Sequence, residues 1–243
     1  MRILKEPRLR EYAKQHSRAA SPLRHWRSVA RSAYWKTFTD VKSTFGSADQ
    51  ITVPNGRQVV VFNIGGGAFR LLTAIYYNRG IVYIRKFMTH AEYSKDDSEK
   101  RPMTTTHLSL PAEAPESYEE LVRLYPPRKI HDQIELEHAT EVSDWIALRA
   151  KNDAQLDYLE LLGDLLEEYE NRSAKPDKAS PPLEILNYLI RENDISTREL
   201  GKILGVDHSV AARILKGERA ITVEHAKSLG ARFKVDPKVF LEL

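Results

Sequence analysis

Apolar residues recur with two different periods along the first hundred residues. From residue 8 to about residue 35 they stand three and four positions apart, which is the spacing of an amphipathic helix. The dipeptide Ser21-Pro22 is suited to an N-cap followed by proline in a first turn, so we expect two helices. Three β-branched, apolar runs follow, separated by glycine-containing turns, at residues 58–64, 68–77 and 80–88. The pattern predicts two helices followed by an antiparallel sheet, a compact α+β unit.

Beyond residue 103 the pattern changes to helix signals throughout. Residues 104–117 are rich in Thr, Ser, Pro and Ala and are expected to be a linker. An amphipathic helix is expected after Pro126-Pro127, and a leucine-rich helix after Asn152-Asp153. The first helix is expected to carry Ile130, Ile134, Val142 and Ile146 on its apolar face. A polar linker at 171–182 then leads to a third, all-helical unit. The predicted domains are residues 1–102, 103–180 and 181–243.

The charges of these units differ in sign. Residues 1–102 hold 19 Lys+Arg and 8 Asp+Glu, whereas residues 103–243 hold 18 and 26, so the total of +3 hides a +11 unit joined to a −8 unit. Most of the acid lies in residues 103–180, with 8 basic and 17 acidic residues. Such asymmetry favours nucleic acid as a partner of the basic unit and favours contact between the units themselves.

Composition also excludes several classes of site. The chain has no cysteine, which rules out disulfides, thiolate zinc sites and cysteine nucleophiles. Its eight histidines do not follow a metal-ligand spacing, so we expect neither a metal nor a cofactor. No apolar run reaches the length of about 20 residues that a membrane helix needs, and the first residues lack the apolar core of a signal peptide. A cytoplasmic protein is expected.

Residues 196–219 carry the local signals of two short helices joined by a tight turn. Ser196 and Glu199 have the spacing of a capping box. Gly205 is suited to the left-handed residue that ends the first helix, and Asp207 is suited to cap the second. A tight turn lets the two helices cross closely. A recognition helix needs this close crossing if its N-terminus is to enter the major groove. The pattern predicts a helix-turn-helix.

This segment resembles the phage-repressor-like (Xre/Cro) helix-turn-helix family. The resemblance implies a homodimer that binds a palindromic operator. It implies base contacts from Asp207, His208, Ser209 and Arg213. It also implies phosphate contacts from Ser196, Thr197, Lys216 and Arg219. The plain alternative is a small helical bundle whose polar surface binds nothing.

The basic unit places cations, a histidine and a tyrosine around its predicted sheet. Metal-free cleavage of RNA needs a group that takes the proton of the 2′-hydroxyl, cations that neutralise the phosphorane, and an acid that protonates the leaving oxygen. Aromatic faces can hold unstacked bases. The required residue types occur at Lys36, Arg57, Arg70, Arg85, Lys86, His90 and Tyr93. Alternate arginines on a strand can equally be a solvated face.

Two segments of this unit carry specific motifs: residues 61–71 contain Asn-x-Gly-Gly-x-x-x-Arg-Leu, and residues 83–93 contain Thr-His-x-x-Tyr. On these motifs the unit resembles the HigB toxins, mRNA interferases of the RelE-like superfamily that cut messages on the ribosome. The resemblance covers residues 1 to about 100. It implies catalytic roles, with His90 foremost in proton transfer, for Arg70, Arg85, Lys86, His90 and Tyr93. It implies weaker RNA contacts from Lys36, Arg57 and Asn63.

Residues 118–170 contain Tyr118-Glu119-Glu120-Leu121, Pro126-Pro127-Arg128 and Tyr158-Leu159-Glu160-Leu161-Leu162. With these segments they resemble the N-terminal part of HigA antitoxins, which carry a C-terminal helix-turn-helix. The chain is therefore interpreted as a HigB-like toxin joined to its HigA-like antitoxin, with mRNA and the ribosome as partners of one part and operator DNA of the other. The toxin–antitoxin contact could form within one chain or between two. Met103 resembles the start of a second protein, so a natural and an artificial join both stay open. The competing interpretation is a non-enzymatic regulator whose basic domain binds a nucleic acid or a protein.

Overall fold

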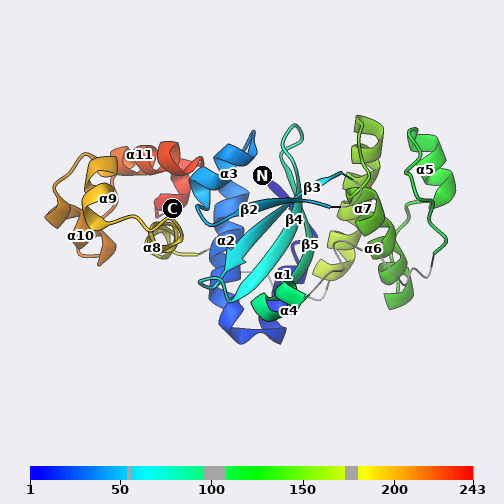
Figure 1. The fold of residues 1–243 in the computed structure, drawn as a ribbon, viewed down its shortest axis with the longest axis horizontal. Helices are drawn as coiled ribbons and strands as arrows, with labels where there is room; N and C mark the ends of the chain where they lie inside the picture. The colour runs from blue at the N-terminus through cyan, green and yellow to red at the C-terminus, as the bar shows by residue number, and fades with distance from the viewer. Residues whose placement is uncertain (54–55, 96–107, 173–179, 243) are drawn as a thin grey trace.

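The computed structural model describes residues 1–53, 56–95, 108–172 and 180–242. A sheet and its helices α1–α4 form the centre of the molecule (Figure 1). Helices α5–α7 lie at one end and helices α8–α11 at the other. The predicted seam at Met103, the turn residue Asn55, the start of the predicted linker 104–117 and residues 173–179 of the other predicted linker fall outside the described residues.

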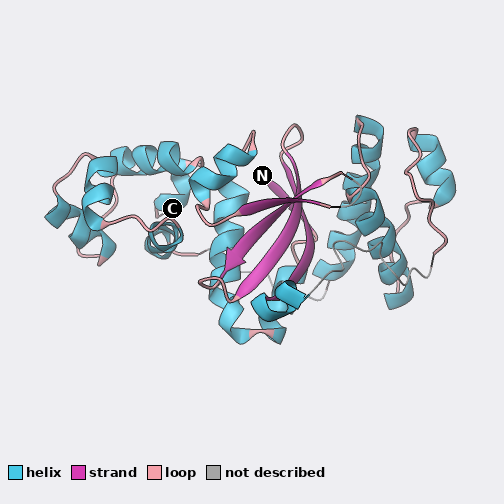
Figure 2. Cartoon of the chain, in the orientation of Figure 1, coloured by secondary structure: helices cyan, strands magenta, loops and turns pink. Residues whose placement is uncertain are grey.

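The sheet, magenta in Figure 2, has five strands in the order β1-β5-β4-β3-β2. Their bounds are Arg2–Leu4, Asp49–Thr52, Gln58–Ile64, Phe69–Tyr76 and Ile81–Thr89 for β1 to β5. The three predicted runs are confirmed as the antiparallel meander β3-β4-β5. The prediction of a purely antiparallel sheet is wrong, because β1 pairs with β5 in parallel. A strand of three residues leaves too short a pattern to be detected from the sequence.

Helices cover one face of this sheet. They are α1 (Arg8–Gln15), α2 (Ala20–Ser32) and α3 (Phe38–Thr44), with the 3-10 turn η1 (Ser17–Ala19). The prediction of two helices therefore missed α3, which Thr37 and Asp40 start with a capping box. Ser21-Pro22 lies inside the first turn of α2, whose N-cap is Ala19. Trp26 of α2 packs edge-on against Phe62 of β3 at 5.2 Å between ring centroids.

The acidic helices cover the opposite face. They are α5 (Tyr118–Leu124), α6 (Gln133–Ala147) and α7 (Asp153–Asn171). Along β5, Val82 and Ile84 join the core under α2, whereas Ile81 and Tyr83 join a second core with Trp145 of α6. This alternation follows from the two-residue period of a strand. The sheet is therefore sandwiched between two helical layers.

Two expectations for this region need correction. Ile134 was expected on the apolar face of α6, but it is 65% exposed, and Ile130 precedes the helix. The described part of the expected linker, residues 108–117, packs along the acidic helices instead of spanning solvent. Trp145 and Arg149 of the α6 region donate to backbone carbonyls of Pro111 and Ala112, at 2.8 and 2.7 Å.

The C-terminal helices dock against α2 and α3. They are α8 (Pro182–Glu192), α9 (Thr197–Leu204), α10 (His208–Leu215) and α11 (Val223–Phe233), followed by η3 (Pro237–Phe240). Their apolar residues continue the core that lies under α2. Thr44 donates to the Phe233 carbonyl at 2.6 Å, and the Asn193 amide donates to the Thr44 carbonyl at 2.9 Å.

Candidate functional site

The glycine turn between β3 and β4 positions Arg70. Gly65, Gly66 and Gly67 all have positive φ, at 64°, 66° and 84°, a conformation that favours glycine. The Arg70 guanidinium folds back onto this turn and donates to the Gly67 carbonyl at 2.7 Å. It lies over the ring of Tyr93, 5.8 Å from the centroid. The turn therefore fixes a half-buried cation beside a tyrosine.

His90 stands at the start of the short helix α4 (His90–Lys95). Thr89 and Glu92 make the two reciprocal bonds of a capping box, at 3.2 and 2.7 Å. The Thr89 hydroxyl and N–H both donate to the Glu92 carboxylate, which holds the pKa of that carboxyl below its usual value. The His90 backbone N–H donates to the Ala68 carbonyl at 2.9 Å, which ties α4 to the glycine turn. The imidazole is exposed to solvent.

The sheet register collects five predicted residues at this end. Arg70 pairs with Asn63 on one side and with Met88 on the other, two positions before His90. Lys86 pairs with Leu72 and is exposed, and a register shift between Leu72 and Thr73 places Arg85 next to it as the extra residue. The group, called the Arg70 end below, comprises Asn63, Arg70, Lys86, His90 and Tyr93. Asn63 itself donates to the Ser47 carbonyl at 2.9 Å.

Lys36 and Arg57 lie away from this group. They line a hollow of 630 Å³ with Tyr76, at the opposite end of β4. Arg70 and Tyr76 are six positions apart on one strand, which is roughly 20 Å at about 3.3 Å per residue. Arg57 lies over the Tyr76 ring at 5.1 Å and donates to the Ala150 carbonyl. The structure therefore does not bring these two predicted RNA contacts to the Arg70 end.

Sequence reasoning missed a buried polar cluster between the sheet and α6. The Lys5 side chain is fully buried, and its ammonium lies 2.8 Å from Asp144 Oδ1. The Tyr83 hydroxyl donates to the same oxygen at 2.8 Å. Burial lowers the pKa of Lys5 to about 8, although Asp144 opposes that shift. A lysine directly after β1 gave no local signal of burial, because its partner lies 139 residues away.

The predicted DNA-contacting residues gather on the outer surface of α9 and α10. Of the eight, Thr197 is half-buried and the others are exposed. Ser196 forms the predicted capping box with Glu199, Gly205 has φ 65°, and Asp207 caps α10 by accepting from the Ser209 N–H at 2.9 Å. The N–H of Ser209 also lowers the pKa of the Asp207 carboxyl. Two predicted DNA ligands therefore also serve as helix caps.

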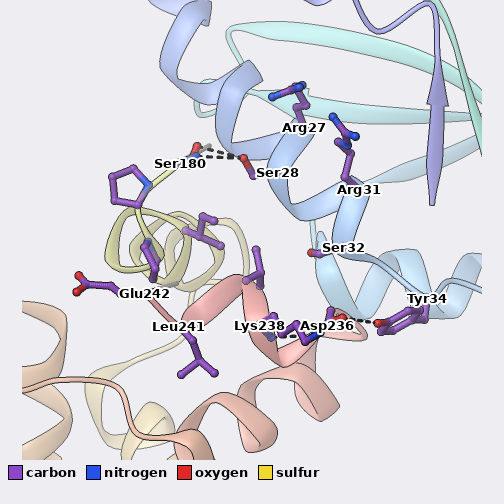
Figure 3. A pocket seen from close by; sticks show the side chains of 14 residues that line it. Arg27, Ser28, Arg31, Ser32, Tyr34, Ser180, Asp236, Lys238, Leu241 and Glu242 are labelled. Carbon is purple, nitrogen blue, oxygen red and sulfur yellow. Dashed lines mark hydrogen bonds between the residues drawn. The ribbon is translucent and has the colours of Figure 1, made fainter. Parts of the chain in front are cut away.

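A larger hollow of 910 Å³ lies between α2 and the C-terminal region (Figure 3). Arg27, Arg31 and Lys238 are among the residues that line it. Arg27 is paired with the buried carboxylate of Glu6 at 2.6 Å. None of the predicted site residues lines this hollow, so it is separate from both candidate nucleic-acid surfaces.

Within the described ranges, no group of His, Cys, Asp and Glu side chains could hold a metal ion. In the same ranges, no helix has the length and apolar character needed to cross a membrane. The chemical groups at the Arg70 end are an exposed imidazole, a phenol and cations. Those groups can transfer protons and neutralise phosphate charge.

Comparison with known proteins points to one family for the central unit. Residues 19–96 match the HigB toxin family, described as the RelE-like toxic component of a toxin-antitoxin system. The mRNA interferase toxin HigB of Escherichia coli K12 is 26% identical over 93 residues, which cover 38% of this chain and 88% of the relative. The mRNA interferase HigB of Shigella flexneri matches with the same figures. Residues 19–96 of this chain are therefore a RelE-like domain of the HigB toxin type.

Proposed function

We propose that this protein is a type II toxin–antitoxin protein in which a HigB-like mRNA endoribonuclease is joined to its HigA-like antitoxin. The observation that carries the proposal is the Arg70 end, where Arg70, His90 and Tyr93 come together from a glycine turn and a capped helix. The names of the relatives, which are mRNA interferases, support the same substrate.

The proposed cleavage needs no metal ion. His90 is exposed and takes the proton from the attacking 2′-hydroxyl or returns one to the leaving oxygen. Arg70 and Lys86 neutralise the charge of the phosphorane, with Arg85 beside them. Tyr93 orients Arg70 through the ring contact at 5.8 Å. Following the HigB resemblance, the message is cut on the ribosome in the cytoplasm.

The acidic helices α5–α7 are the proposed neutralising segment. They pack on the same sheet face that carries Arg70, and their carboxylates pair with cations of the described residues up to residue 95, called the toxin unit below. Arg79 faces Asp153 and Asp157 at 3.0 and 2.9 Å, and Arg2 faces Glu160 at 3.5 Å. Opposite charges of this kind speed docking, while the buried leucines contribute most of the affinity.

The C-terminal helices are proposed to bind the operator of the protein's own operon as a homodimer. The exposed predicted ligands on α9 and α10 support this role. Gly201 supports the close crossing that the motif needs, because a Cβ there would lie 2.9 Å from the Val206 carbonyl oxygen. Arg213→Ala should weaken binding to the operator without changing RNA cleavage, as a gel-shift titration would show.

The alternative proposal is a non-enzymatic transcription regulator. It is favoured by Arg57 and Asn63, whose side chains donate to backbone carbonyls of the chain itself. In this alternative the basic face is a docking surface and cuts nothing.

Growth of a two-chain version distinguishes these functions. Residues 1–102 and 103–243 are expressed from separate promoters, and expression of the second is then stopped. Under the proposed function growth should arrest, and renewed expression of residues 103–243 should restore it. His90→Ala in the first chain should remove the arrest while operator binding by the second stays unchanged. Continued growth of the unchanged pair would favour the regulator.

A further inference from the structure

The connection between α6 and α7 lies directly on the sheet face that carries Arg70. We call residues 147–150 the corner. The Tyr76 hydroxyl donates to the Ala147 carbonyl, and Arg57 donates to the Ala150 carbonyl. Between these two bonds, Leu148 packs against the apolar surface of the sheet. The corner therefore contacts the toxin unit through two backbone oxygens and one apolar side chain.

The apolar surface under Leu148 continues to the Arg70 end. It consists of Val53, Val59, Val61, Leu72 and Met88, and we call it the floor. Tyr93 packs against the same floor, and Arg70 lies over Tyr93. One continuous surface thus joins the corner to the proposed catalytic group.

Cations line this floor along its length. Lys86 pairs with the floor residue Leu72, and Arg70 pairs with the floor residue Met88. Arg57 stands at the far end, beside Tyr76. Single-stranded nucleic acid binds to surfaces of this kind, where bases rest on apolar or aromatic groups and phosphates meet arginine and lysine.

The groups that the corner presents correspond to those of a nucleotide. A phosphate oxygen and a peptide carbonyl oxygen are both acceptors for a guanidinium. We propose that the corner occupies a subsite for one unpaired nucleotide of RNA, with Leu148 in the place of the base and the Ala150 carbonyl in the place of a phosphate oxygen at Arg57. RNA and the corner then exclude one another. The choice of RNA as the ligand rests on the proposed function.

The rest of the acidic segment has its own anchors. Lys5 pairs with Asp144 at 2.8 Å, and Arg79 pairs with Asp153 and Asp157. These contacts do not involve the floor. A substitution at the corner can therefore weaken its hold on the floor while the helices stay docked.

Binding of a non-cleavable RNA to the full chain tests this inference. The probe is a fluorescent single strand of about ten 2′-O-methyl nucleotides, and the readout is its anisotropy. Leu148→Ser should lower the Kd about tenfold, since the corner then loses the burial of a leucine side chain on the floor and competes less strongly with RNA. Leu161→Ser is the matched control, because Leu161 is a leucine of α7 that is already 37% exposed. The control should leave the Kd unchanged.

Two further variants identify the subsite. Adding Arg57→Ala to Leu148→Ser should reverse the gain in affinity. Tyr76→Phe keeps the ring under Arg57 but removes the donor to the Ala147 carbonyl, and it should give a smaller gain of about threefold. Circular dichroism of each variant checks that the fold is retained. Equal RNA affinity for Leu148→Ser, Tyr76→Phe and the unchanged chain would overturn the inference.

Cleavage of an ordinary RNA separates this inference from the proposed function. If the Leu148→Ser chain binds the 2′-O-methyl probe tightly but cuts no RNA, the proposed nuclease activity is contradicted and the proposed subsite is supported. If the Leu148→Ser chain cuts RNA but binds the probe no better than the unchanged chain does, the proposed subsite is contradicted and the proposed nuclease activity is supported.

Discussion

The toxin unit is contacted on its two sides by regions of different chemistry. On the side of α5–α7, cations from residues 1–102 meet carboxylates from residues 103–180, and one of these cations, Lys5, is fully buried beside Asp144. On the side of α8–α11, the contacts are mainly aromatic and neutral, as between Phe45 and Tyr188 at 6.2 Å. Charged groups also take part at its edges: Glu184 faces His25 at 2.9 Å and Arg24 at 3.3 Å, and the Tyr34 hydroxyl donates to Asp236 at 2.7 Å.

This difference shows where in the structure the charge asymmetry of the sequence acts. The acidic segment matches the basic unit at a real interface, whereas the nearly neutral C-terminal region docks by packing and hydrogen bonds. Complementary charge therefore guides the docking of the acidic segment, whereas complementary shape guides the docking of the C-terminal region. Variants that remove one kind of contact should distinguish the two sides, because the loss of stability should differ in size and in its dependence on pH and salt.

The largest effect is expected from Asp144→Ala. Lys5 is fully buried and would lose its counter-charge, which costs about 3–5 kcal/mol when one partner of a buried pair is removed. Urea unfolding of the full chain measures the loss. The double variant Lys5→Met with Asp144→Leu should recover most of it, because no charge is then left unpaired. A double variant as unstable as Asp144→Ala would contradict this account of the cluster.

On the other side, Thr44→Val should cost about 2 kcal/mol. The Thr44 hydroxyl accepts from Trp35 Nε1 at 2.8 Å and donates to the Phe233 carbonyl at 2.6 Å. Valine has nearly the same shape but leaves both buried partners unsatisfied. The loss should be the same at low and high salt in urea unfolding, because neither partner is charged. A loss that shrinks with added salt would assign this contact to electrostatics.

The pH dependence of stability should show the burial of Lys5. Its pKa falls from 10.5 to about 8 in the folded protein. Between these values the folded chain binds fewer protons than the unfolded chain, so its stability rises with pH. The expected gain between pH 8 and 10 is on the order of 2 kcal/mol relative to Lys5→Met. Above pH 10 the raised pKa of Tyr83 acts in the opposite direction. Identical pH profiles for Lys5→Met and the unchanged chain would contradict this burial.

The smallest effect is expected from Arg79→Ala. Arg79 bonds Asp153 and Asp157 at the surface, and exposed pairs contribute little because water and salt screen them. A small fall in the melting temperature is expected at low ionic strength. It should vanish at about 0.5 M NaCl, where the Debye length is only a few ångströms. A large fall in the melting temperature that persists at high salt would show that the Arg79 pairs are not screened by solvent and would contradict this prediction.

Local patterns predicted the elements whose signals are local. The β-branched, apolar runs in residues 58–88 predicted β3, β4 and β5, and the caps of α9 and α10 followed from Ser196, Gly205 and Asp207. These features depend on residues that are neighbours in the sequence. The three-residue strand β1 gave no such signal, because its pairing with β5 joins residues about 80 positions apart.

The candidate site divides in the same way. Arg70, His90 and Tyr93 come together because β4, β5 and α4 are consecutive, so their grouping followed from the order of the chain. The separate position of Arg57 depends on the register of β3 against β4 and on the corner from α6. Neither can be read from residue types near Arg57. The buried partner of Lys5 was hidden for the same reason.

The central claim is most directly tested by mapping mRNA 5′ ends in cells that carry the two-chain version. The ends are compared before and after residues 103–243 are withdrawn, for the unchanged first chain and for its His90→Ala and Arg70→Ala variants. New internal ends are expected with the unchanged chain, and those ends should be lost in both variants. Unchanged mRNA ends, whether or not growth arrests, would contradict the proposed nuclease activity and would favour a DNA-binding regulator.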